Sequence, residues 1–232
     1  MTLDRGLGLL GLIVGLPSFL ALFFSDHATT ALLCVVIAVL AIGAAVWVNK
    51  VGTDHPFRMD VVEVHLDLSK GPSQATLTKT YKIVPNFNHL TQMVHRNIAA
   101  DGDVRDFNWN GRPIPDAQQR RTMGGEYEIT VPFTPAPSRG KPFDGKLSYD
   151  LIDSFPAHSE SLGYVVDFPT KIVTITVTLP TNKACLTAIP RLAFGGQERD
   201  LRDLIIAPDR CTLKYSVKKP RVGSQIITYW TW

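Results

Sequence analysis

Two uncharged, apolar runs lie close together near the start of the chain, at residues 7–24 and 31–48. Each run is 18 residues long, which corresponds to about 27 Å as a helix that rises about 1.5 Å per residue. The hydrocarbon core of a bilayer is about 30 Å thick, so each run is just long enough to cross it. The pattern therefore predicts a two-helix transmembrane hairpin over residues 1–50, with spans at about 7–24 and 31–48.

The few charges beside these runs predict the orientation of the hairpin. The connecting turn carries Asp26 but no Lys or Arg, whereas Arg5 precedes the first run and Lys50 and Arg58 follow the second. Lys and Arg favour the cytoplasmic side of membrane-spanning segments. We therefore expect a multi-pass protein with both termini in the cytoplasm.

Small residues are spaced for close helix packing in both runs. Gly11 and Gly15 share one face of the first expected helix, and Ala41 and Ala45 share one face of the second. In lipid, small residues let helix backbones approach closely. These four residues are interpreted as transmembrane packing positions, either within one hairpin or between copies of the chain.

Beyond a linker at residues 51–60, the pattern changes to that of β-strands. Apolar and polar residues alternate from Val62 to Leu68, from Lys171 to Leu179 and from Cys211 to Lys218. Alternation with a period of two is typical of strands with one buried face. Residues 61–232 are therefore predicted to form an all-β cytoplasmic sensor domain, an antiparallel barrel or sandwich of about eight to ten strands.

Two local features modify this all-β prediction. Phe87, Leu90, Val94 and Ile98 recur at helical spacing, which predicts one short helix. The Asp-Gly pair at 144–145 lies between β-prone runs and predicts a hairpin turn.

The charge balance and the motifs exclude several classes of function. Residues 54–232 hold 22 of the 24 Lys and Arg residues and 19 of the 21 Asp and Glu residues, so this region is mixed in sign and is not expected to bind DNA or RNA. There is no nucleophile elbow, phosphate-binding loop, dinucleotide fingerprint or zinc-ligand spacing. We therefore predict no enzyme activity, no catalytic residue and no metal. A loose group of acids around His158 is interpreted as solvated surface, with a metal or general-base site as the alternative.

Several short segments resemble a known family. They are Asp153-Ser-Phe-Pro with Glu160, Phe168-Pro-Thr before the strand at 171–179, Pro180 after it, and Lys219-Pro-Arg-Val-Gly-Ser leading to Tyr229-Trp-Thr-Trp232. Together with the two-span layout, they resemble the two-transmembrane, β-strand-rich effectors of bacterial cyclic-oligonucleotide antiphage defence systems.

This resemblance implies a function, a location and partners. The β domain would bind a regulatory cyclic di- or trinucleotide that a partner nucleotidyltransferase makes, and no other cofactor is implied. The ligand would control homo-oligomerisation, and clustered hairpins would disrupt the lipid bilayer of the bacterial inner membrane.

A cyclic nucleotide requires aromatic faces for its bases and cations for its phosphates. We chose the candidate ligand-binding residues by these residue types: Trp109, Arg120, Arg121, Tyr127, Arg191, Arg199, Arg202, Tyr215 and Arg221.

Two other interpretations remain open. One is a membrane-anchored β-sandwich module that binds another protein without a nucleotide. The other is an envelope module with its β domain outside the cell, in which Cys185 and Cys211 would form a disulfide.

Overall fold

The computed structural model describes residues 55–232, which form one compact unit of β-strands. A single 3₁₀ turn, η1 (Asp116–Gln118), interrupts them. The strands are β1 (Phe57–Asp67), β2 (Gln74–Pro85), β3 (Gln92–Ile98), β4 (Asp103–Trp109), β5 (Arg112–Pro113), β6 (Gln119–Arg121), β7 (Tyr127–Pro132), β8 (Phe143–Ile152), β9 (Ser159–Val165), β10 (Thr170–Thr178), β11 (Thr187–Phe194), β12 (Gln197–Asp200), β13 (Ile205–Ile206), β14 (Thr212–Lys218) and β15 (Gln225–Thr231).

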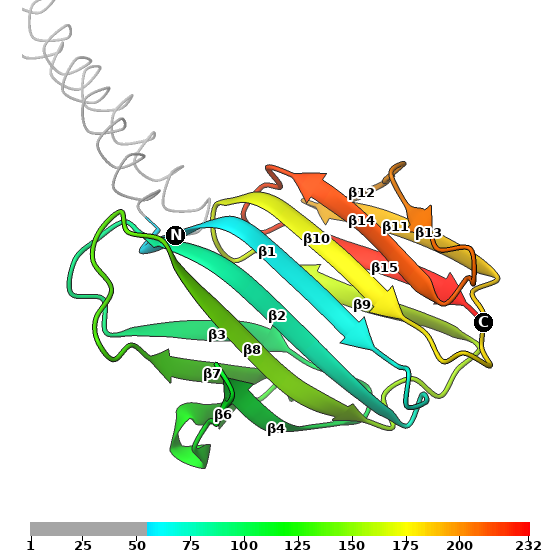
Figure 1. Cartoon of the computed structure of the whole chain (residues 1–232), viewed down its shortest axis with the longest axis horizontal. Coiled ribbons are helices and arrows are strands. Elements are labelled where there is room, and N and C mark those ends of the chain that lie inside the picture. The colour runs from blue at the N-terminus through cyan, green and yellow to red at the C-terminus, as the bar shows by residue number, and fades with distance from the viewer. Residues whose placement is uncertain (1–54) are drawn as a thin grey trace, which may run out of the picture. The chain divides into compact units, whose positions relative to one another are not determined.

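The largest sheet, sheet A, has the strand order β13-β14-β10-β1-β2-β8-β4-β5 (Figure 1). One pair inside this sheet, β1 and β10, is parallel, with Val64 opposite Ile175. The other neighbours in sheet A are antiparallel. Sheet A is therefore a mixed sheet whose middle joins two segments that are far apart in the sequence.

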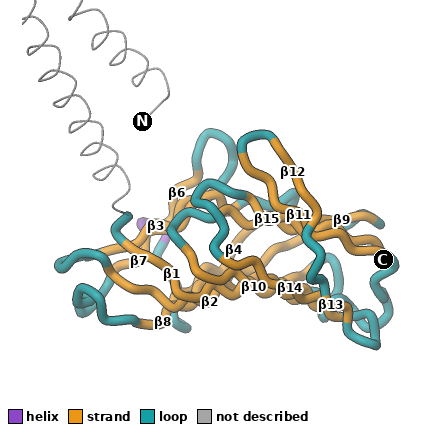
Figure 2. The backbone as a smooth tube through the Cα atoms, turned by 90° about the horizontal axis from the view of Figure 1, so that it is seen from above, coloured by secondary structure: helices purple, strands orange, loops and turns teal. Residues whose placement is uncertain are grey.

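Two smaller antiparallel sheets complete the domain. Sheet B has the order β3-β7-β6, and sheet C has the order β12-β11-β15-β9. β3, β7, β9 and β15 lie behind the long strands of sheet A in Figure 1, and Figure 2 shows the same layering from above. Each sheet has two free ends, so residues 55–232 form layers and not a closed barrel.

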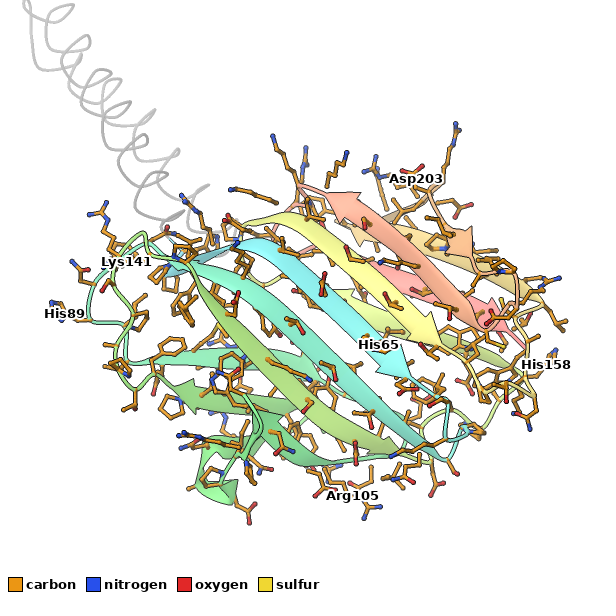
Figure 3. The ribbon with its side chains drawn as sticks, viewed as in Figure 1. His65, His89, Arg105, Lys141, His158 and Asp203 are labelled. Carbon is orange, nitrogen blue, oxygen red and sulfur yellow. The ribbon has the colours of Figure 1, made fainter. Side chains whose placement is uncertain are left out.

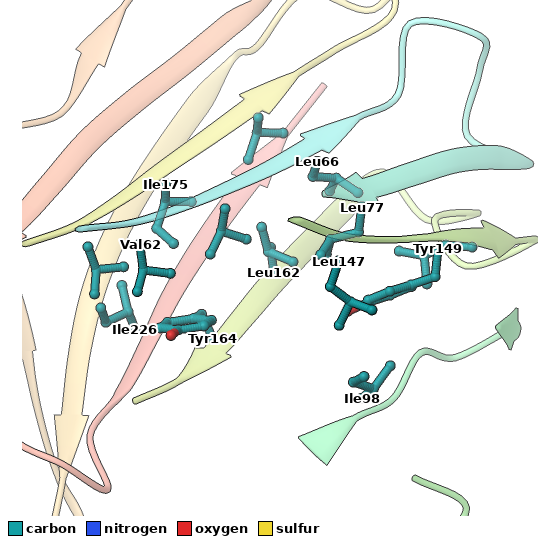
Figure 4. Packing of buried hydrophobic residues seen from close by; sticks show 14 of the residues in the cluster. Val62, Leu66, Leu77, Ile98, Leu147, Tyr149, Leu162, Tyr164, Ile175 and Ile226 are labelled. Carbon is teal, nitrogen blue, oxygen red and sulfur yellow. The ribbon is translucent and has the colours of Figure 1, made fainter. Parts of the chain in front are cut away.

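The core lies between these layers because the strands of sheet A are apolar on one face only. In β10, Val173, Ile175 and Val177 are buried, while the threonines between them are partly exposed. Buried residues of sheet A such as Val62 pack with those of sheet C such as Ile226 (Figure 4). Burying one such side chain contributes about 1.5–3 kcal/mol relative to leaving it exposed.

The helix predicted from residues 87–98 is wrong. Residues 92–98 form strand β3, in which Met93 and His95 are buried next to exposed or half-buried neighbours. A bulge beyond His95, where Asn97 has a φ of 56°, turns Ile98 back into the core. Of the four residues whose spacing suggested a helix, Phe87 is exposed, Leu90 and Val94 are half-buried and only Ile98 is buried, so that spacing does not mark a buried face.

The predicted antiparallel fold with eight to ten strands and a hairpin at 144–145 is also corrected. The described residues form fifteen strands in three sheets, with one parallel pair. Asp144 and Gly145 lie inside β8, paired with β2. A Cβ atom at Gly145 would overlap the indole of Trp109, so this glycine leaves room for a ring and makes no turn.

The prediction of a multi-pass inner-membrane protein is wrong for the part of the chain that the structure describes. Residues 55–232 form no helix long and apolar enough to cross a membrane, and no helical hairpin. The predicted spans at 7–24 and 31–48, with Gly11, Gly15, Ala41 and Ala45, lie outside the described residues.

Candidate functional site

A basic hollow of about 350 Å³ lies where the ends of β11 and β12 in sheet C approach the end of β14 in sheet A. Its lining includes one aromatic ring, one amide, one carboxylate and four cationic side chains. We call this set the basic hollow: Phe194, Gln197, Glu198, Arg199, Lys218, Lys219 and Arg221.

Two tight turns place these side chains. Gly195 and Gly196 both have positive φ, at 59° and 79°, and connect β11 to β12 with Phe194 opposite Gln197. Two residues with positive φ are typical of the hairpin turn that matches the twist of strands. After β14, Lys219 has a φ of 47°, and the Ser224 N–H donates to the Arg221 carbonyl at 3.0 Å. Lys219 and Arg221 therefore lie on a defined turn, whereas Arg199 and Lys218 belong to β12 and β14.

The one carboxylate of the basic hollow, that of Glu198, is engaged by Arg191, and so is the neighbouring carboxylate of Asp200. Arg191 donates to Glu198 Oε2 and to Asp200 Oδ1, both at 3.1 Å. Within the described part of the chain, the four cations of the basic hollow have no ion-pair partner. The hollow therefore combines positive charge with donor groups that remain free for an anion.

The aromatic ring of the basic hollow already holds one cation. The Arg221 guanidinium lies over the Phe194 ring, 5.5 Å from its centroid, and Phe194 is 44% exposed. A guanidinium on a ring face is a preorganised donor. The arrangement can bind a phosphate and offer a flat surface to an attached ring.

The structure brings together two of the predicted ligand-binding residues and separates the rest. Arg199 and Arg221 line the basic hollow. Arg191 is held by its two carboxylates and lies over the Tyr229 ring at 5.3 Å. Arg202 is exposed between β12 and β13. Tyr215 is a core residue whose hydroxyl is 2.8 Å from that of Thr228.

The other four predicted residues belong to sheets A and B, away from the basic hollow. Arg120 forms an ion pair with Glu128, and the Arg121 guanidinium lies 5.6 Å from the Tyr127 ring centroid. Trp109 lines a second hollow.

Of the basic hollow, sequence reasoning assigned only Arg199 and Arg221 to a ligand site. Lys218 and Lys219 belong to a locally basic segment that equally fits solvated surface, and Phe194 fits core packing. The Gly-Gly pair that follows Phe194 is the signal that was available, because it predicts a hairpin that exposes the ring.

A second polar feature is enclosed in the core. Lys79 of β2 points inward, and its Nζ lies 5.8 Å from the Tyr149 ring centroid and 5.7 Å from that of Tyr164. Burial lowers the pKa of Lys79 to about 8, against the opposing charge of Asp167. Burial also raises the pKa of the Asp167 carboxyl, which accepts a hydrogen bond from Asn97 Nδ2 at 3.4 Å. This group links strands of all three sheets.

His95 lies beside the buried group around Lys79. Its Nδ1 is 3.2 Å from the Tyr81 hydroxyl, and its ring centroid is 5.3 Å from that of Trp109. Its Nε2 is buried without a hydrogen-bond partner in the structure. Burial, assisted by the charge of Lys79, lowers the pKa of His95 to about 3. The imidazole is therefore neutral at physiological pH.

The alternative sites considered from the sequence are not formed within residues 55–232. No group of three or more His, Cys, Asp or Glu side chains in this range is placed to hold a metal ion. Cys185 and Cys211 are both buried and free, so the disulfide considered for an envelope module is not present.

Comparisons with known proteins give only distant similarities. No protein family and no curated protein matches the sequence. Leukotriene A4 hydrolase from Saccharomyces cerevisiae has a TM-score of 0.43 at 11% identity, covering 75% of this chain and 29% of that protein. Aminopeptidase A from Legionella pneumophila has a TM-score of 0.43 at 11% identity, with coverages of 76% and 22%.

A putative protease from Parabacteroides distasonis has a TM-score of 0.38 at 10% identity, with coverages of 76% and 40%. In each comparison, the chain spans less than half of the other protein. These scores do not establish a shared fold. The described part of the chain is therefore defined by its own features: a layered all-β domain with a basic, ring-bearing hollow.

Proposed function

We propose that residues 55–232 form a receptor domain that binds a cyclic di- or trinucleotide in the basic hollow. The observation that supports this function is the combination of four cations, free of carboxylate partners within the described residues, with the exposed ring of Phe194. Arg and Lys bind phosphate oxygens, and aromatic faces stack on bases.

The size of the basic hollow supports a further part of the proposal. At about 350 Å³ it lies near the lower end of the range for ligand sites, enough for one nucleotide of a cyclic ligand. A symmetric ligand then presents its second nucleotide to the same hollow of a second copy, which is a closed two-fold arrangement. Ligand-controlled association of copies is the outcome we propose. The proposal concerns residues 55–232 alone and does not include membrane disruption.

Binding of the ligand is tested on the purified full-length chain by calorimetric titration with a panel of cyclic di- and trinucleotides. The double variant Arg199→Gln/Arg221→Gln removes two cations of the basic hollow. We expect it to weaken binding of the preferred compound at least tenfold, because charge-assisted bonds to phosphate contribute about 1.5–3 kcal/mol each. Raising the salt concentration is expected to weaken wild-type binding.

The matched control is Arg105→Gln/Lys141→Gln. It removes the same net charge at exposed positions that lie away from Asp203 and the neighbouring β12 (Figure 3). Equal loss of affinity in both double variants would refute binding in the basic hollow. Absence of binding by every compound, with an intact melting transition, would refute the nucleotide receptor altogether.

One observation favours protein binding as a second candidate function. Strand β13 is at a free end of sheet A, and its Ile205 and Ile206 are 67% and 38% exposed. An exposed apolar edge strand can pair with a strand of another protein. If no cyclic nucleotide binds, a pull-down experiment tests this function. Loss of a specific partner with Ile205→Lys, but not with Ile172→Lys, would support it.

A further inference from the structure

A second hollow, of about 730 Å³, lies at the β5 end of sheet A. We call it the proline pocket, because five of its sixteen lining residues are prolines. Its walls come from the end of β4, from β5, from the segment around η1 and from the loop between β7 and β8. Its volume lies within the range of about 300–1,000 Å³ that is typical of small-molecule sites.

The walls of the proline pocket are apolar and flat. Trp109, Phe133 and Phe143 contribute aromatic rings, and Ile114 and Val131 contribute buried aliphatic side chains. Indole and phenyl faces offer offset or edge-to-face contacts to another ring. The occupant that fits this lining is mostly apolar and contains a planar ring.

The aromatic walls are held by contacts with one another and with residues outside the proline pocket. Phe133 packs edge-on against Phe57 and Phe143, with centroid distances of 5.7 Å and 5.3 Å. The indole of Trp109 lies on Gly145, where a Cβ atom would overlap it, and packs at a tilt beside His95, with ring centroids 5.3 Å apart. Because the rings are fixed before a ligand arrives, little ordering is needed on binding.

The polar part of the proline pocket selects the charge of the occupant. Arg112 is its one charged lining residue, and no carboxylate lines it. Arg112 is exposed and, within residues 55–232, forms no ion pair. A single free guanidinium beside an apolar wall complements a ligand that carries one carboxylate or one similar anionic group.

We propose that the proline pocket binds a planar aromatic monoanion, with its ring between Trp109 and the phenylalanines and its anionic group on Arg112. This site is separate from the basic hollow, where four cations suit a ligand with several phosphates. The domain would therefore carry two sites of different chemistry.

The test uses two fluorescent probes on the full-length chain: anilinonaphthalene sulfonate, which is an aromatic monoanion, and its uncharged parent phenylnaphthylamine. Arg112→Gln is expected to weaken binding of the anionic probe about threefold to tenfold, because the charge contact is partly solvated. The affinity for the neutral probe should not change. Arg105→Gln, which removes an exposed arginine of β4 outside the pocket, is the matched control and should change neither affinity.

Filling the proline pocket separates it from other apolar surfaces that bind such probes. Ala136→Trp, and independently Ser138→Trp, place a large ring in the loop that lines the pocket, so each should abolish saturable binding of both probes. Arg199→Gln/Arg221→Gln should leave both affinities at the wild-type level. Retained binding of both probes in the two filled variants, with unchanged melting temperatures, would overturn the site. An equal effect of Arg112→Gln on the two probes would overturn the selection for an anion.

Discussion

His95 is a buried imidazole that is hydrogen-bonded at only one of its two nitrogens. Tyr81 is the partner at Nδ1, and Nε2 has none in the structure. A buried polar atom without a partner costs about 1–3 kcal/mol. Tilted packing of the Tyr81, His95 and Trp109 rings, with centroids 5.2–6.4 Å apart, offsets part of this cost. The imidazole therefore makes the core sensitive to pH.

We expect His95 to destabilise the domain as the pH falls. Its folded-state pKa of about 3 lies below the unfolded value of about 6.5, so the unfolded chain binds the additional proton between these values. Acidification from pH 6.5 to pH 4 should lower the free energy of unfolding by roughly 3 kcal/mol through this residue alone.

The double variant Tyr81→Phe/His95→Leu should lose the part of the pH dependence that His95 causes. Urea unfolding at each pH measures the free energy of unfolding of both proteins. His158→Gln, at an exposed position, is the control and should keep the wild-type slope. A double variant with the same slope as wild type would contradict a buried neutral imidazole.

At alkaline pH, we expect Lys79 to determine how the free energy of unfolding depends on pH. Its folded-state pKa of about 8 lies below the ordinary 10.5, so the unfolded chain binds more protons between these values and stability rises with pH. Between pH 8 and pH 9.5 the rise should be about 2 kcal/mol in the free energy of unfolding.

Lys79→Met should flatten this rise in guanidinium unfolding curves. Lys82→Met, at an exposed position of the same strand, should leave it in place. If Lys79→Met and Lys82→Met change the slope equally, the charge at position 79 is not desolvated as the structure indicates.

At the scale of elements, one glycine controls the approach of β4 to β8. A Cβ atom at Gly102 would overlap the Ile152 carbonyl oxygen and lie 2.8 Å from the Asp153 carbonyl carbon. Both are backbone atoms, which cannot rotate away as a side chain can. We expect Gly102→Ala to lower the free energy of unfolding by about 2–4 kcal/mol.

Gly124→Ala is the matched control for this prediction. The nearest atom to its added methyl group is the Thr122 hydroxyl at 3.7 Å, so a change within about 0.5 kcal/mol is expected in the same denaturation experiment. Equal stability of the two variants would mean that β4 and β8 are not as close at Gly102 as described.

Strands with strict alternation were predictable from the sequence, and strands with bulges were not. β10 and β14 follow the alternation of Ile175 and Leu213 with polar residues, and the structure places both where that pattern predicts them. β3 contains a bulge at Asn97, so its buried residues Met93, His95 and Ile98 break the period of two that identifies a strand. The hairpin predicted from the Asp-Gly pair at 144–145 was wrong for another reason. The glycine of this pair leaves room for the indole of Trp109 and does not form a turn.

The candidate site was predictable only in its residue types. The choice of Arg199 and Arg221 followed from the chemistry of phosphate binding, and the structure places both beside one hollow. The same chemistry also selected Arg120, which forms an ion pair with Glu128. The sequence does not reveal which arginines find a carboxylate, because that depends on strand pairing such as that of β6 with β7.

For the whole described domain, the layered architecture depends on pairings between distant segments. Nothing local in the sequence indicates that Val64 lies beside Ile175 in a parallel pair. Such a pair needs a long connection, and its register is determined by the burial of both strands in the finished core. The strands were therefore accessible to sequence reasoning, and their order in sheet A was not.

The parallel pairing of β1 with β10 also determines when the domain can fold on the ribosome. About a hundred residues must be added after β1 before its partner exists, which takes on the order of ten seconds at typical translation rates. Until then one edge of β1, with its run of valines, has no neighbour and can pair with another nascent chain. A chaperone that shields this strand during synthesis would raise the yield of native protein, and a chain that terminates before β10 would be expected to aggregate.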